Sequence, residues 1–234
     1  MTAPQSGRHL LGALGTVVVG AVVVVGVSGL LRVLAAVPPT LRARPVGVVQ
    51  TAVGPLTRAS LTLSTYPDSL AGEHGSGGGA HPGWVSYGPT TNLWVPAHAL
   101  VTVTIRNYDG ATTLTDPFYG RVQGTVGGVE WVNGRATRGV PAAQVAHTFT
   151  IHMFPTPGQP LLDVSVPLPG VPASTPVGAD GYPAPTVVTF QFRTGASGRY
   201  IWQCEDPCGT RVGGFGGPMS TQGYMTGTLV VGHG

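Results

Sequence analysis

Two short segments of the chain decide its fold, Ala146-His147-Thr148-Phe149-Thr150-Ile151 and Tyr200-Ile201-Trp202-Gln203-Cys204-Glu205-Asp206-Pro207-Cys208. In each, large apolar residues alternate with other residues, a period typical of a β-strand that buries one face. The first segment places His147 on its apolar face, whereas the second places Cys204 there, with Cys208 four residues later. Imidazole and thiolate are soft ligands that suit copper. The two segments therefore predict strands that carry candidate metal ligands.

The rest of the chain favours an all-β domain. Glycine (37) and proline (22) together make up about a quarter of the 234 residues and separate short apolar runs. Residues 92–106, 186–193 and 224–231 read as further strands, and 111–144 reads as an excursion that contains a hairpin or a lid. No amphipathic helix is expected after residue 40, so we expect an antiparallel β-sandwich.

Charge and motifs exclude several classes of function. Only 9% of residues are charged, and the net charge of +3 comes from dispersed arginines, so we expect no nucleic-acid partner. The sequence contains no nucleophile elbow, no phosphate-binding glycine loop and no His-Glu-x-x-His motif. The sequence therefore gives little support for a stand-alone enzyme.

The N-terminal part predicts a membrane anchor. A short tail, 1–9, precedes 22 uncharged residues, 10–31, which as a helix would cover roughly 33 Å, about the thickness of a bilayer. We favour an uncleaved signal-anchor over a cleaved signal peptide, because the run is long and Arg32 follows it directly. A linker is expected over 32–58, and a globular domain over 59–234.

Four segments, in this order, resemble cupredoxins, the small β-sandwiches that hold copper for electron transfer. They are Asn107-Tyr108-Asp109, His147–Ile151, the aromatic strand that leads to Cys204, and Gly223–Val231, which contains Met225. The resemblance covers residues 92–232. It implies an antiparallel Greek-key sandwich, a copper site and an extracytoplasmic domain that acts as an electron carrier or accessory oxidase subunit. The arginines after residue 31 instead favour a cytoplasmic domain by the positive-inside rule, and the sequence leaves this conflict open.

The spacing of Cys204, Glu205 and Cys208 is similar to the start of the copper-A motif of cytochrome c oxidase subunit II. That motif continues with a histidine and a methionine, where this chain has Val212 and Phe215. The resemblance therefore implies a modified copper site and a respiratory oxidase or another redox protein as partner. The candidate ligands are His147, Cys204, Cys208 and Met225, a soft set that favours Cu(I) over Cu(II).

Two other interpretations remain open. The same residues would serve a Cu(I) carrier that does not cycle between oxidation states. Alternatively, a metal-free structural module would join Cys204 to Cys208 as a disulfide. Among the other candidates, His98 is the one histidine that we retain as a replacement ligand, and Met219 reads as a core residue.

Overall fold

The structure, a computed structural model, describes residues 17–30, 39–52, 54–68, 81, 83–153, 156–208 and 217–233. The chain divides into two compact units, 1–37 and 38–234. In the first unit, residues 17–30 are helical. No helix within the described residues is both long and apolar enough to cross a membrane. The remainder of the expected anchor, 10–16 and 31, lies outside those residues.

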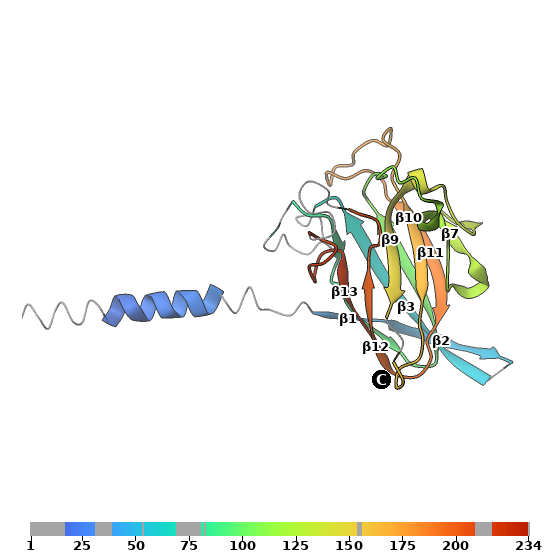
Figure 1. Ribbon diagram of the computed structural model, residues 1–234, viewed down its shortest axis with the longest axis horizontal. Coiled ribbons are helices and arrows are strands. Elements are labelled where there is room, and N and C mark those ends of the chain that lie inside the picture. The colour runs from blue at the N-terminus through green and yellow to red at the C-terminus, as the bar shows by residue number, and fades with distance from the viewer. Residues whose placement is uncertain are drawn as a thin grey trace, which may run out of the picture. The chain divides into compact units, whose positions relative to one another are not determined.

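The second unit is a sandwich of two β-sheets (Figure 1). In the described part of the chain, one sheet has six strands in the spatial order β1 (Thr40–Arg42), β5 (Asn92–Pro96), β13 (Thr226–Gly232), β12 (Gly198–Gln203), β9 (Val145–His152) and β10 (Val164–Pro169). The other sheet there has seven, in the order β2 (Arg44–Thr51), β3 (Gly54–Tyr66), β6 (Ala99–Asn107), β11 (Thr186–Arg193), β7 (Glu130–Val132) and β8 (Arg135–Thr137), with β4 (Ser86–Gly88) beside β3.

The core lies between the two sheets and follows the alternation of the sequence. In β6, the expected inward residues Val101, Val103 and Ile105 are completely buried. Phe149 of β9 and Trp202 of β12 meet them from the other sheet, in one continuous apolar cluster. The expected strand faces are thus confirmed, because alternate side chains of a strand point to opposite faces of its sheet.

The sheets are mixed and not purely antiparallel as expected. Within the described residues, β5 is parallel to both β1 and β13, and β3 is parallel to β6. Parallel neighbours need a long connection between them. The connection between the parallel strands β3 and β6 runs from Tyr66 to Ala99. It contains β4, which pairs with β3, and then β5, which belongs to the other sheet.

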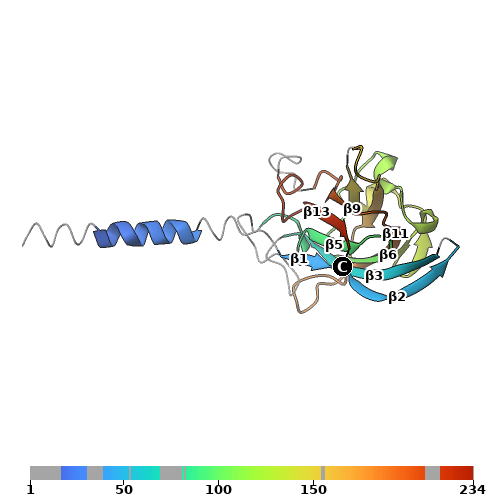
Figure 2. The same ribbon diagram turned by 90° about the horizontal axis from the view of Figure 1, so that it is seen from below.

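Two expected elements differ in extent. The strand expected over 92–106 is divided into β5 and β6, because the chain changes sheet at Ala97-His98, where His98 has a φ of +50°. The segment 32–58, expected to be a linker, contains β1, β2 and the start of β3. Its prolines and glycine are accommodated because β2 is a largely exposed outer strand, with a bulge between Pro45 and Gly47. Figure 2 shows β2 and β3 running together.

The excursion 111–144 contains the expected hairpin, formed by β7 and β8. Asn133 and Gly134 connect these strands with φ values of +47° and +80°. Positive φ at both central residues suits a tight two-residue hairpin turn. Three short 3₁₀ helices, η1 (Pro117–Gly120), η2 (Val126–Gly128) and η3 (Ala142–Gln144), complete this segment among the described residues.

Candidate metal centre

Three candidate ligands converge at one end of the sandwich. The potential ligand atoms of His147, Cys204 and Cys208 all lie within 4.8 Å of one another, and all three residues are buried. His147 lies near the start of β9, and Cys204 directly follows β12. Because β9 and β12 are antiparallel neighbours, the start of one and the end of the other meet at the same edge. The sandwich itself thus brings together residues 57 positions apart.

The two ring nitrogens of His147 face different partners. Nε2 lies 3.1 Å from Oδ2 of Asp109, while Nδ1 faces Sγ of Cys204 at 3.8 Å. Histidines that bind metals commonly donate their second ring N–H to a carboxylate, which fixes both the tautomer and the ring orientation. In this arrangement Asp109 occupies Nε2 and leaves Nδ1 directed at the two cysteines.

The turn after β6 holds Asp109 in place. Asn107 donates from Nδ2 to the carbonyls of Asp109 (3.1 Å) and Pro169 (2.9 Å), and its Oδ1 accepts from the Asp109 N–H at 3.1 Å. The hydroxyl of Thr65, at the end of β3, donates to the same Oδ1. The side chain of Asn107 is completely buried and so joins three segments. The Asn-x-Asp turn therefore positions the carboxylate that meets His147.

Cys204 is held by the residues on either side of it in the sheet. Its N–H donates to the carbonyl of Met225 at 2.9 Å, which continues the ladder between β12 and β13. Its Sγ accepts from the N–H of Thr148 at 3.4 Å. The hydroxyl of Thr148 in turn accepts from the N–H of Glu205 at 2.7 Å. These contacts support a thiolate at a defined position, because hydrogen bonds to the charged form favour it.

Protons are distributed unequally among the three candidate ligands. Burial alone lowers the pKa of His147, but its hydrogen bonds with Asp109 and Cys204 outweigh burial and raise that pKa to about 10. Burial alone raises the pKa of Cys204, but hydrogen bonds with Cys208 and His147 hold it well below the usual value. The hydrogen bond to Cys204, together with burial, raises the pKa of Cys208. Without metal, these directions favour an imidazolium beside one thiolate and one thiol.

A further buried carboxyl lies within the cysteine loop. Oδ2 of Asp206 accepts from the hydroxyl of Thr112 at 2.6 Å, whereas Oδ1 has no hydrogen-bond partner among the described residues. Burial raises the pKa of Asp206 to about 7, although the hydrogen bond from Thr112 opposes this. Thr112 also donates from its N–H to Val145 at 2.9 Å. The start of the excursion thus connects the cysteine loop to β9.

The other residues considered for the site are placed as follows. Met225 is completely buried beside Cys204, and Met219 is 2% exposed in the same apolar cluster. His152 lies on the other face of β9, with Nε2 at 3.3 Å from Oε1 of Glu205. His98, near Gly195, lies where the chain crosses between the sheets, away from the cysteines in the topology. Val212 and Phe215 lie outside the described residues.

Sequence reasoning missed the groups that surround the candidate ligands. Asp109 was expected only as part of a turn, and its contact with His147 joins residues 38 positions apart. Asp206 is completely buried, although carboxylates in loops are usually exposed. The signal available in the sequence was a carboxylate in the turn that follows β6. Its value depends on knowing that this turn meets β9 of the other sheet.

Comparisons with known proteins give structural similarities alone. No protein-family model and no curated protein matches the chain. Among solved structures, auracyanin B is 16% identical, with 81% of this chain and 96% of that chain covered, at a TM-score of 0.30. Rusticyanin from Thiobacillus ferrooxidans is 17% identical, with 80% and 87% covered, at 0.31. A multicopper oxidase is 14% identical, with 85% and 49% covered, at 0.36. These TM-scores lie below 0.5, so the interpretation of the site rests on its own geometry.

Proposed function

We propose that this protein binds copper through His147, Cys204 and Cys208, with Met225 as a further sulfur ligand, and that it transfers electrons. The observation that carries the proposal is the convergence of one imidazole and two cysteine sulfurs within 4.8 Å, all buried. The two cysteines do not form a disulfide in the structure. A buried set of thiolate, imidazole and thioether groups is the soft environment that copper prefers.

The protonation of the centre supports a cation there. When no cation is bound, the imidazole of His147 keeps a proton between the Cys204 thiolate and Asp109, and this imidazolium supplies the positive charge. Metal ligands must lose such protons when they bind. The orphan oxygen of the buried Asp206 is a further negative or polar group without a partner among the described residues. Buried polar atoms of this kind often indicate an ion or a water molecule.

Copper, when bound, would supply a site that accepts and releases a single electron. The protein provides the surroundings that make this reversible. Asp109 fixes the ring of His147, and the N–H of Thr148 stabilises the sulfur of Cys204. The side chains of His147 and Cys204 are completely buried, so bulk water is excluded from them. A rigid, dry ligand set changes little between oxidation states, which favours electron transfer.

The setting that we propose for this activity comes from the sequence. The apolar segment 10–31 anchors the protein in a membrane, and the cupredoxin-like domain lies outside the cytoplasm. The copper-A-like spacing of Cys204 and Cys208 supports a respiratory oxidase, or another redox protein, as the partner. Protease digestion of sealed vesicles whose outer surface is the extracytoplasmic face of the membrane would test the orientation. Digestion of the domain only after the vesicles are opened would contradict it.

Copper titration of the full-length reduced protein tests the function. We expect stoichiometric binding of Cu(I), and a thiolate-to-copper charge-transfer band after oxidation. Cys204→Ser and His147→Ala should each remove the band and weaken binding by at least roughly tenfold, because losing a ligand should cost no less than losing an outer partner, which costs roughly 10- to 100-fold. His152→Ala is the matched control, because this histidine lies on the other face of β9, and it should bind normally. A protein that binds no stoichiometric copper contradicts the proposal.

A Cu(I) carrier is the second candidate function. It is favoured by the presence of only one histidine in the converging group among the described residues, since two imidazoles are typical of blue-copper sites. A reversible Cu(II)/Cu(I) couple in a redox titration would exclude a pure carrier, and failure to form a stable Cu(II) state would favour it. A thiol count on protein that has not been reduced separates both from a metal-free module, in which Cys204 and Cys208 form a disulfide.

A further inference from the structure

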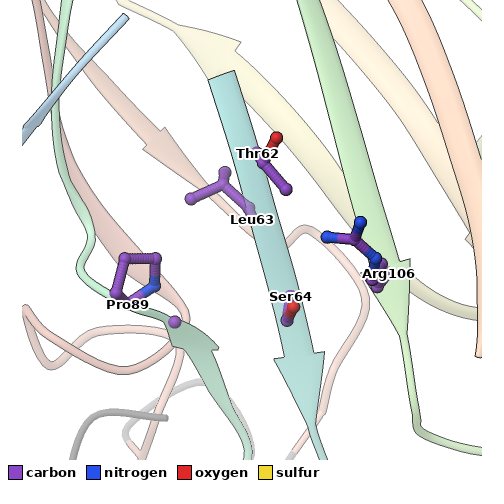
Figure 3. Close-up of a pocket in the computed structure, with 6 residues that line it drawn as sticks. Thr62, Leu63, Ser64, Pro89 and Arg106 are labelled. Atoms are coloured by element: carbon purple, nitrogen blue, oxygen red, sulfur yellow. The ribbon is translucent and has the colours of Figure 1, made fainter. Parts of the chain in front are cut away.

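A second candidate site lies on β3, away from the cysteines. β2 pairs with β3 only as far as Ser60, and β4 begins its pairing at Ser64. The intervening residues 61–63 therefore have a strand neighbour on one side only within the described residues. At this gap is a cavity of about 270 Å³. It is lined by Thr62, Leu63, Ser64, Gly88, Pro89 and Arg106 (Figure 3).

The cavity contains a guanidinium without a carboxylate partner. Arg106 lies directly opposite Ser64 in the parallel pairing of β3 and β6, so both side chains are on the outer face of the sheet. In the described part of the chain, the two ion pairs both involve histidine, so Arg106 has no acidic partner there. An arginine is a fixed positive charge with five N–H donors. An anion can therefore bind to Arg106 without the loss of an existing ion pair.

The remaining walls suit a small organic group. Figure 3 shows Arg106 on one side of β3 and the ring of Pro89 on the other. The exposed hydroxyl of Thr62 lies along the same strand, and the Ser64 hydroxyl is a hydrogen-bond partner of the Tyr66 phenol. An anion on Arg106 would thus also meet Thr62, and an apolar body could extend across β3 towards Pro89.

We propose that this pocket binds a small organic carboxylate. The planar fork of a guanidinium pairs with a carboxylate through two parallel hydrogen bonds. Arg106 is the sole charged residue among those that line the cavity, which balances a single negative charge better than the nearly double charge of phosphate. The volume lies just below the roughly 300–1,000 Å³ of pockets for drug-sized ligands, so the carboxylate should contain only a few heavy atoms.

The test uses the full-length, copper-free protein with ¹⁵N-labelled arginine, so its outcome does not depend on the metal centre. Sodium propionate is titrated at constant ionic strength, and the side-chain Nε–Hε signals are followed by NMR. We expect a saturable shift of the Arg106 signal, and no shift with propionamide, the neutral analogue. Inorganic phosphate at the same concentration should bind more weakly than propionate.

Variants separate this site from general charge effects. Arg106→Gln should weaken propionate binding by roughly tenfold or more, since hydrogen bonds to charged groups contribute about 1.5–3 kcal/mol. Thr62→Val, which keeps the arginine, should weaken binding by a few-fold. Arg58→Gln, on the exposed side of the same strand, should leave binding unchanged. The proposal is overturned if Arg106 shows no saturable shift, if all exposed arginines shift together, or if phosphate binds as tightly as propionate.

Discussion

Two carboxyl groups, the partly buried Asp109 beside the metal centre and the completely buried Glu130 in the β7–β8 hairpin, behave in opposite ways. Oδ1 of Asp109 accepts from the Gly110 N–H at 2.7 Å, and Oδ2 meets His147 at 3.1 Å. Glu130 is completely buried, and neither of its oxygens has a hydrogen-bond partner among the described residues. Burial alone raises the pKa of both, but the hydrogen bond with His147 reverses this at Asp109 and lowers its pKa. At Glu130 burial is unopposed and raises the pKa to about 8.

Hydrogen-bond partners, and not burial alone, therefore decide which of these carboxyl groups is kept ionised. Glu130 lies opposite Phe190 in the pairing of β7 with β11, so it shares the core-facing side of the sheet. A neutral acid is tolerated there, whereas an ionised one is costly without a partner. Around the metal centre, the protein instead surrounds its charged groups with hydrogen-bond donors. That arrangement is expected where ionised ligands are needed.

The largest effect is expected for Glu130→Gln, which keeps the size of the side chain but cannot ionise. The pKa of Glu130 is about 8 in the folded protein and near 4.5 when exposed, so the unfolded state releases the proton first as pH rises. Stability should therefore fall between about pH 4.5 and pH 8 in the wild type, and it should fall less in the variant, where the raised pKa of Asp206, about 7, still contributes. At pH 7 the variant should be more stable by about 3 kcal/mol. Urea unfolding at pH 5 and pH 8 measures this difference.

Glu205→Gln provides the control, because Glu205 is partly exposed. That variant should change the free energy of unfolding by less than about 0.5 kcal/mol at either pH, as is usual for surface substitutions. A wild type whose stability does not fall between pH 5 and pH 8 would show that Glu130 has a partner in solution. The contrast with Asp109 would then be lost.

The second effect sharpens the other side of the comparison. Asp109→Asn keeps the size of the side chain and removes its charge, so His147 loses the group that holds its proton and orients its ring. We expect copper affinity to fall by roughly 10- to 100-fold, the usual effect of changing such an outer partner. The pKa of His147 should also fall from about 10 towards its ordinary value. Competition with a Cu(I) chelator measures the first change, and NMR titration of the imidazole measures the second.

Asp163→Asn is the matched control, because Asp163 is exposed and lies directly before β10. It should alter neither measurement. If Asp109→Asn binds copper as tightly as the wild type, then Asp109 is not a positioning residue. The histidine would then be held by its strand alone.

The sequence was sufficient to predict the strands that carry the centre, because their side chains alternate over a full strand length. Phe190 and Phe192 in β11, or Tyr200 and Trp202 in β12, are buried on the expected faces. The strand order was less accessible, since β3–β6 and β5–β13 are parallel and join distant segments. The expected linker was wrong in extent for a related reason: an exposed outer strand such as β2 lacks the apolar alternation that reveals a strand.

The candidate ligands could be predicted from the sequence, but not the groups that support them. His147 and Cys204 were recognised because both fall on the buried face of an apolar strand. Asp109, Thr148 and Asp206 gave no such signal, since carboxylates and hydroxyls near turns are usually exposed. Their positions depend on which strand ends meet in space, which local patterns do not determine.

Asp206 is intermediate between Asp109 and Glu130, since one of its oxygens is bonded and the other is not. Its pKa of about 7 also lies between those of the other two. If partners decide where charge is kept, removing its one side-chain donor should make Asp206 behave more like Glu130. Thr112→Val performs this change, because valine has nearly the shape of threonine without the hydroxyl.

The smallest effect is therefore expected for Thr112→Val. The pKa of Asp206 should rise above about 7, because the hydrogen bond from Thr112 favours the ionised form. The loss of stability should be about 1 kcal/mol, the usual contribution of one hydrogen bond, and greater at pH 8 than at pH 6, since only the ionised carboxylate needs the donor strongly. Carboxyl ¹³C NMR and urea unfolding of the copper-free protein measure both. Thr104→Val, whose hydroxyl meets that of Thr189 on the outer face of the other sheet, should leave the pKa of Asp206 unchanged. An equal loss at both pH values would mean that Thr112 stabilises the fold through its second contact, with the carbonyl of Val145, and not through the charge of Asp206.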